Sequence, residues 1–164
     1  MNPISYWQRL KVAFQYVMPQ IYMTQAAGWL AKQKWGAVTH FVIKAFAKKY
    51  NIDMSIAEKE KFSDYASFNE FFIRPLKENA RPINQNPTAL CCPADGRVSE
   101  CGHIDDDRLL QAKGHFFSLN DLLAEDKDLT ETFKNGEFVT TYLSPRDYHR
   151  VHMPCDGTLR KMIY

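Results

Sequence analysis

Apolar residues in the first 50 positions recur at intervals of three and four, the spacing of one face of a helix. Two sets show this pattern. The first set is Trp7, Leu10, Phe14, Val17, Met18 and Ile21, and the second is Val38, Phe41, Val42, Ala45 and Phe46. The sequence therefore predicts two amphipathic helices in this part of the chain.

Local signals extend the helical section to about residue 75. Ser55 and Glu58 have the spacing of a capping box, in which two side chains satisfy free backbone N–H groups where a helix begins. Pro75 disfavours helical geometry in the residue before it, so we expect helical structure to end near Arg74. Prolines and asparagines in residues 82–87 then indicate a loop.

From residue 89 onward the pattern changes to short β segments separated by turn dipeptides. The candidate strands are residues 90–92, 97–99, 138–143 and 158–164, and the turns are Asp95-Gly96, Asn135-Gly136 and Asp156-Gly157. A helical interlude at residues 119–133 divides the series. We predict an α+β fold with a helical section at residues 1–75 and a β-rich core at residues 76–164. Because the last candidate strand ends the sequence as an unpaired edge, we expect a fragment whose β-rich core is incomplete.

Charge divides the chain in the same way. Residues 1–52 hold seven basic and no acidic residues, whereas the remaining 112 residues hold 14 basic and 19 acidic residues. Residues 12–31 carry no charge and have the length of a membrane span, but Pro19 and three glutamines argue against a span or a secretory signal. Basic helices with apolar stripes and aromatic rings are typical of segments that lie on an anionic membrane surface. Packing of both stripes inside the protein is the alternative, and scattered basic residues disfavour nucleic acid.

Reactive side chains gather in three short stretches: Asp95 at a turn, Lys113 and His115 around a glycine, and residues 144–154. The alternatives without a catalytic role are an ordinary hairpin turn for Asp95 and a solvated loop for residues 113–115. His149 and His152 lie three apart in a segment bounded by prolines. An extended segment would point the two rings to opposite faces, so we predict two separate roles and no shared metal.

Two arginines and four cysteines complete the candidate chemistry. Arg146 and Arg150 flank the histidine segment, and a guanidinium suits a phosphate group. Cys91 and Cys92 are neighbours, a poor disulfide pair, so we expect a reducing compartment. Cys155 has no Cys-x-x-Cys partner that would indicate zinc.

Several motifs together resemble bacterial phosphatidylserine decarboxylases. They are Phe68-Asn69-Glu70-Phe71-Phe72-Ile73-Arg74-Pro75-Leu76, Arg81-Pro82-Ile83, Pro93-Ala94-Asp95-Gly96, Gln111-Ala112-Lys113-Gly114-His115 and the run from Tyr142 to Pro154. The Tyr148-His149-Arg150-Val151-His152-Met153-Pro154 run is the most specific of them.

The resemblance implies a self-cleaving proenzyme of phospholipid biosynthesis that converts phosphatidylserine to phosphatidylethanolamine and CO2. It implies a pyruvoyl group formed from a serine in a Gly-Ser step, at the start of a small subunit cut from the same proenzyme. Asp95 and His152 match the charge relay for self-cleavage, and His149 matches the histidine that assists decarboxylation. The resemblance also implies a peripheral position on the cytoplasmic face of the bacterial inner membrane. It allows a homodimer without requiring one.

The sequence departs from the family at the cofactor precursor. None of its seven glycines is followed by serine, so we expect the pyruvoyl serine to lie beyond this chain and the chain alone to be inactive. Two rival hypotheses stay open, namely a non-enzymatic membrane-surface binding module and a hydrolase that pairs Cys91, Cys92 or Cys155 with His152.

Overall fold

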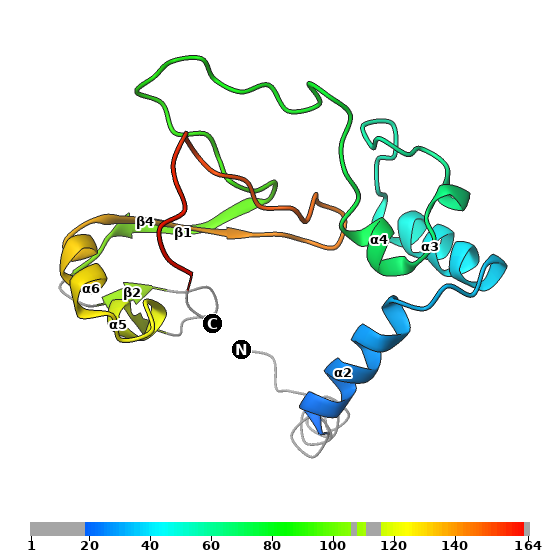
Figure 1. The fold of residues 1–164 in the computed structure, drawn as a ribbon, viewed down its shortest axis with the longest axis horizontal. Helices are drawn as coiled ribbons and strands as arrows, with labels where there is room; N and C mark the ends of the chain where they lie inside the picture. The colour runs from blue at the N-terminus through cyan, green and yellow to red at the C-terminus, as the bar shows by residue number, and fades with distance from the viewer. Residues whose placement is uncertain (1–18, 106–107, 111–115, 163–164) are drawn as a thin grey trace, which may run out of the picture.

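A computed structural model describes residues 19–105, 108–110 and 116–162 (Figure 1). The helices are α2 (Gln20–Ala31), α3 (Ala37–Tyr50), the short 3-10 turn η1 (Phe62–Asp64), α4 (Phe68–Phe72), α5 (Leu119–Leu122) and α6 (Lys127–Phe133). The strands are β1 (Arg97–His103), β2 (Arg108–Leu110), β3 (Phe116–Ser118) and β4 (Glu137–Tyr142). Helices therefore dominate the first part and strands enter after residue 96, as the α+β prediction states.

The core of the helical section forms where α3 packs on η1 and α4. Ile43, Ala47, Tyr65 and Phe71 are buried together, with Phe46 and Phe68 packed against them. α3 turns a different face to solvent, on which Val38, Phe41 and Val42 are exposed. The apolar stripe predicted for this helix is thus mostly exposed, whereas its last member, Phe46, packs against the core. Of the first predicted stripe only Ile21 lies among the described residues, and it is 72% exposed in α2.

α4 begins at a capping box formed by Ser67 and Glu70, whereas the sequence predicts a capping box at Ser55 and Glu58. The Ser67 hydroxyl accepts the Glu70 N–H at 3.1 Å, and the Glu70 carboxylate accepts the Ala66 N–H at 2.9 Å. The helix predicted to start at Ser55 is absent, so that prediction is wrong. Asp53 accounts for the difference, because its carboxylate accepts both the backbone N–H and the hydroxyl of Ser55. The predicted end of helical structure near Arg74 is confirmed, since α4 ends at Phe72.

Two small antiparallel sheets make up the β structure. β1 pairs with β4, with Arg97 opposite Tyr142 and His103 opposite Glu137, and β2 pairs with β3. The register shifts between Val98 and Glu100, a bulge near the start of β1. The predicted strands at 97–99 and 138–143 are confirmed with slightly different bounds. Residues 90–92 and the described residues 158–162 form no strand, so those two predictions are wrong.

A second, smaller core lies under the far end of β1. Ile104 and Leu119 are buried there, with Leu123 and Phe138 against them. α5 and α6 fill the predicted helical interlude, and Asn135 takes a left-handed backbone conformation at the turn into β4. The end of the sheet near His103 is therefore held by this core.

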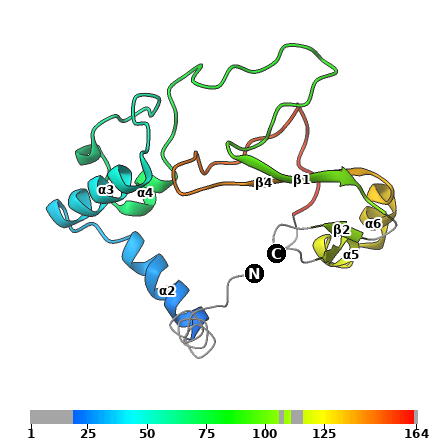
Figure 2. The same cartoon turned by 180° about the vertical axis from the view of Figure 1, so that it is seen from behind.

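The helices α2–α4 and the sheets occupy opposite ends of the molecule (Figures 1 and 2). Two connections run between them (Figure 2). One is the long loop that leaves α4, and the other is the returning segment, residues 143–154, which follows β4. α2 projects away from α3 and α4 and has no buried residue. Over residues 19–105, 108–110 and 116–162, no helix has the length and apolar content needed to cross a bilayer.

Candidate functional site

The returning segment after β4 is fixed by backbone hydrogen bonds to the chain before β1. The Cys91 N–H donates to the Pro154 carbonyl and the His152 N–H donates to the Pro93 carbonyl, each at 2.8 Å. Residues 90–92, predicted as a strand, thus make one isolated backbone contact in place of a ladder. This pairing places the turn that carries Asp95 beside the segment that carries both candidate histidines.

Gly96 sets the position of Asp95. A Cβ at this residue would lie 2.6 Å from the Tyr142 carbonyl oxygen and 2.8 Å from the Thr141 Cγ2 atom. Both distances are closer than any side chain tolerates, so glycine lets the start of β1 approach the end of β4. Asp95 is thereby held at the sheet end that faces the helical section.

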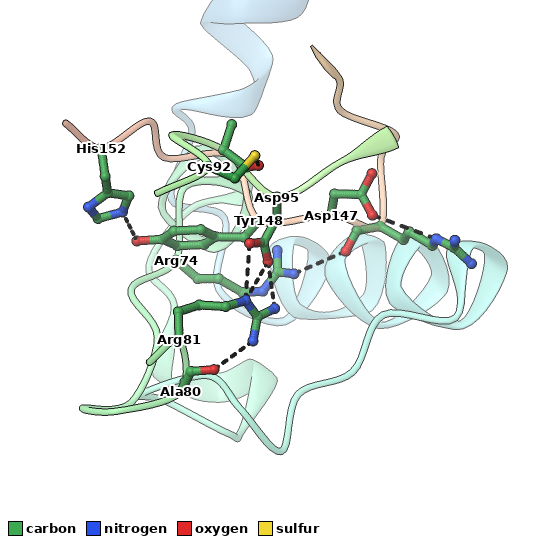
Figure 3. A network of polar contacts seen from close by, with 10 residues as sticks. Arg74, Ala80, Arg81, Cys92, Asp95, Asp147, Tyr148 and His152 are labelled. Carbon is green, nitrogen blue, oxygen red and sulfur yellow. Dashed lines mark hydrogen bonds and ion pairs between the residues drawn. The ribbon is translucent and has the colours of Figure 1, made fainter. Parts of the chain in front are cut away.

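Asp95 is held by Arg81 (Figure 3). The Arg81 Nε atom donates to both carboxylate oxygens at 3.0 and 2.9 Å, and Nη2 donates to Oδ2. This hydrogen-bonded pairing raises the pKa of Arg81 above its ordinary value. The Arg81-Pro82-Ile83 motif quoted for the resemblance therefore contributes the partner of Asp95.

His152 is exposed and contacts Tyr148. The Tyr148 hydroxyl lies 3.0 Å from His152 Nε2, and the two rings stack with centroids 5.5 Å apart. Tyr148 is only 8% exposed and lies between His152 and the Arg81–Asp95 pair (Figure 3). Among the described residues, no hydrogen bond joins Asp95 directly to His152, so the structure brings these two predicted residues near one another without connecting them.

His149 occupies a different environment from His152. Its ring stacks on Phe72 of α4, with centroids 4.0 Å apart and planes at 19°. Its Nε2 atom is buried, and within the described chain it has no hydrogen-bond partner. Burial lowers the pKa of His149 below its ordinary value, and the nearby positive charge of Arg74 lowers it further. The two histidines have separate surroundings, as the odd spacing in an extended segment predicts.

Arg74 is a buried residue for which the sequence predicts no role in a site. It is 2% exposed, and its Nη2 atom donates to the Arg146 carbonyl at 3.3 Å. Its Nε and Nη1 atoms are buried without a partner among the described residues. Desolvation lowers the pKa of Arg74, and its guanidinium lies over the Phe71 ring at 5.4 Å. The available sequence signal was a lone arginine in the apolar run Phe71-Phe72-Ile73-Arg74-Pro75-Leu76.

The two arginines predicted to meet a phosphate differ in their availability. The Arg146 side chain is 70% exposed and contacts Asp147 at 3.6 Å. Arg150 donates from Nε to the Ile73 carbonyl at 2.7 Å, so one face of its guanidinium is already occupied. Arg146 is the freer of the two phosphate candidates.

The other reactive residues that the structure describes form no second site. Lys113 and His115 lie outside the described residues. The thiol of Cys92 donates to the Ala94 carbonyl, whereas His152 Nε2 contacts Tyr148. The four cysteines are free, and in the described part of the chain no three His, Cys, Asp or Glu side chains gather as metal ligands would.

Comparison with known proteins identifies the family. A family model described as phosphatidylserine decarboxylase matches residues 68–164, more than half of the chain. The chain belongs to the phosphatidylserine decarboxylase family. A second family model, described as PSD, matches residues 10–51. The resemblance inferred from the motifs is therefore confirmed.

Curated relatives match nearly the whole chain. The phosphatidylserine decarboxylase proenzyme of Haemophilus influenzae is 89% identical over 164 residues, all of this chain and 57% of the relative. The proenzymes of Pasteurella multocida and Mannheimia succiniciproducens are 78% and 76% identical over 161 residues, 98% of this chain and 55% of each relative. The chain thus spans just over half the length of these phosphatidylserine decarboxylase proenzymes.

The residues of the candidate site all fall within the segment that matches the phosphatidylserine decarboxylase family. Arg74, Asp95, His149 and His152 lie between residues 68 and 164, as does Arg81. The helices α2 and α3 precede this segment.

Proposed function

We propose that this chain supplies the amino-terminal part of a pyruvoyl-dependent phosphatidylserine decarboxylase made as a self-cleaving proenzyme. One observation carries the proposal: backbone pairing of residues 91–93 with 152–154 joins the Asp95 turn to the segment of His149 and His152. This junction lies in the part of the chain that matches the family. The serine that yields the pyruvoyl group belongs to a segment outside these 164 residues.

In the proposed self-cleavage, His152 acts as the base that takes the serine proton, and Asp95 stabilises the resulting imidazolium. Each residue has a different partner in this structure, Tyr148 for His152 and Arg81 for Asp95. Formation of the relay therefore exchanges at least one of these contacts. Because the His152 ring is exposed, its rotation away from the Tyr148 hydroxyl displaces no buried atom.

In the proposed decarboxylation, His149 delivers a proton from Nε2 to the carbon that loses its carboxylate. When bound, a pyruvoyl group supplies the electron sink for that loss. The polar atoms around His149 fit such a group, since Ser144 Oγ and two Arg74 nitrogens are buried donors that lack an acceptor within the described chain. Arg146, the more exposed arginine, meets the substrate phosphate, with Arg150 as the second candidate.

The helical section, residues 1–75, serves as the membrane-associating part, and residues 76–164 form the first part of the catalytic domain. Ile21, Trp29 and Phe41 are exposed on α2 and α3, and an apolar groove of about 460 Å³ lies beside Leu30 and Val42. Five lysines accompany this surface: Lys32, Lys34, Lys44, Lys48 and Lys49. Such a surface suits peripheral attachment to anionic lipid on the cytoplasmic face of the bacterial inner membrane.

A chimeric proenzyme tests the relay. The 164 residues replace the matching segment of the Haemophilus influenzae proenzyme, to which they are 89% identical along their full length. The chimera should appear as two chains and release CO2 from phosphatidylserine. Asp95→Asn and His152→Ala should leave it as one chain, because each removes part of the base that activates the serine.

Two exposed residues provide matched controls. Asp128→Asn changes a carboxylate in α6, and His103→Ala changes an imidazole at the end of β1 opposite to the Asp95 turn. Both control variants should cut normally. Normal cutting of Asp95→Asn and His152→Ala would remove the relay assignment. An uncut and inactive wild-type chimera that still floats with liposomes would favour the membrane-surface module.

A further inference from the structure

We infer that Phe72, Ile73 and Arg74 form a clamp that positions the His149 segment, with Arg74 as its positioning residue. The inference deepens the proposed function, because it assigns residues that set the orientation and surroundings of the proposed proton donor. It rests on contacts that join three successive residues at the end of α4 to three residues of the returning segment.

Each residue of the clamp contacts the segment in a different way. The Phe72 ring stacks on the His149 ring at 4.0 Å. The Ile73 carbonyl accepts the Arg150 Nε hydrogen at 2.7 Å. Arg74 donates from Nη2 to the Arg146 carbonyl at 3.3 Å. One contact is a ring stack and the other two are hydrogen bonds to backbone carbonyls. Together they set the position and the orientation of the His149 ring relative to α4.

The clamp is anchored in the helical core. Phe72 stacks on Phe68 at 6.0 Å with planes at 22°, and it meets Phe46 of α3 edge-on at 6.3 Å. Phe71, its neighbour in α4, is fully buried. The stack of Phe68, Phe72 and His149 therefore continues from the core into the site, and any shift of α4 moves the imidazole.

The charge of Arg74 has no stabilising explanation in this structure. A buried guanidinium is costly unless an anion pairs with it, and among the described residues Arg74 finds only a carbonyl acceptor and the Phe71 ring face. Its neighbour His149 is affected by this charge. The groups that bear on His149 are Phe72 by stacking, Arg74 by repulsion, Asp147 by attraction and the Ser144 backbone by a hydrogen bond. Burial and Arg74 outweigh the other two, so the pKa of His149 lies below its ordinary value and its imidazolium, when formed, is a stronger acid.

The chimeric proenzyme also tests the clamp. Arg74→Met removes the charge and the contact to Arg146 but keeps an apolar stem of similar length. We expect its chains to be cut, its kcat to fall at least tenfold, and the limb of the kcat–pH profile governed by His149 to move to higher pH. Arg74→Lys should restore the position of that limb, since it restores the charge. Arg160→Met, at an exposed arginine, should change neither quantity.

Phe72→Leu provides a second variant that keeps apolar volume in the core. It removes the ring stack, so kcat should fall while KM for phosphatidylserine stays within about twofold. An unchanged kcat and pH profile in both Arg74→Met and Phe72→Leu would overturn the clamp.

NMR titration of the His149 imidazole, assigned by its loss in His149→Gln, separates the clamp from the proposed function. The titration midpoint should rise in Arg74→Met and return in Arg74→Lys whether or not the chimera is active. A wild-type chimera that is inactive but shows this shift would remove the proposed function and leave the clamp. If the wild-type chimera is active but Arg74→Met leaves the titration midpoint of His149 unchanged, the clamp is overturned.

Discussion

The imidazole of His149 stacks on Phe72, its Nε2 atom is closed off from solvent, and this burial disfavours the charged form. The pKa in the folded chain is therefore lower than in the unfolded chain, where the ring titrates near its ordinary value. Between the two pKa values the unfolded chain binds the extra proton, so folding stability rises with pH there. The stability that neutral His149 provides is present above about pH 6.5 and is lost as pH falls.

We predict that this loss is measurable. The denaturation midpoint of the chimeric proenzyme should fall as the pH is lowered from 7.5 to 5.5, and His149→Gln should flatten part of that decline because glutamine does not titrate. His103→Gln, at an exposed histidine paired with Glu137, is the matched control. A decline that is the same in His149→Gln and in the wild type would contradict the assigned burial effect.

Tyr148 shows what a single residue contributes to the arrangement around it. Its hydroxyl contacts His152, while its buried ring lies beside the Arg81–Asp95 pair (Figure 3). The sequence predicts roles for Asp95 and His152 but none for Tyr148. A tyrosine beside a histidine is too common a neighbour for its position between two candidate residues to be read from sequence.

At the scale of elements, Gly96, the residue before β1, lies close against the end of β4. A methyl group there would fall 2.6 Å from the Tyr142 carbonyl oxygen, which is backbone and has little freedom to move. We predict that Gly96→Ala destabilises the chimera by about 1–3 kcal/mol, the usual cost of forcing extra volume into a packed place. It should also reduce self-cleavage, since the turn that carries Asp95 must shift.

Gly102→Ala, within β1, is the control for that prediction. A Cβ at Gly102 would lie 3.8 Å from the nearest atom, the Phe138 Cε1, which is an ordinary contact. Denaturant unfolding and gel analysis of cleavage measure the two effects. Equal unfolding midpoints for the two variants would show that the β1–β4 approach is looser than the structure has it.

Elements with local signals were predictable from the sequence, and elements that depend on distant pairing were not. α3 follows from its apolar spacing, and β1 and β4 follow from alternation beside turn dipeptides. Ser55 had the spacing of a cap, but the nearby Asp53 carboxylate competes for the same hydrogen bonds. The burial of Arg74 depends on Arg146, 72 residues later, and no local pattern reports such a contact.

At the scale of the whole molecule, exposed apolar side chains gather on α2 and α3 while Lys44 and Lys48 add positive charge. We predict that the chimera floats with liposomes that contain anionic lipid. Binding should weaken as salt rises from 0.1 to 1 M, because the Debye length falls from about 10 to about 3 Å. Equal binding to neutral and anionic liposomes at low salt would show that only apolar insertion contributes.

A pair of variants separates the helical surface from apolar exposure in general. Val38→Ser with Phe41→Ser removes exposed apolar groups from α3, where Phe41 is 73% exposed, and should weaken flotation. Leu159→Ser with Met162→Ser removes two apolar groups that are at least as exposed but lie far from α2 and α3 in the sequence. This variant should leave flotation unchanged. The opposite ranking would move the membrane contact to the β-rich part of the chain.

The contacts between α4 and the returning segment also set the order in which the molecule can be completed. Ile73 and Arg150 are 77 residues apart. At the usual pace of translation, about 5–20 residues per second, about 4–15 s pass between the synthesis of one and of the other. Until then the Phe72 ring has no imidazole to cover it, and a nascent chain shorter than 149 residues carries neither histidine of the segment. Translation therefore delays the contacts between α4 and the returning segment until most of the 164 residues have been made. This delay does not depend on how fast each helix folds.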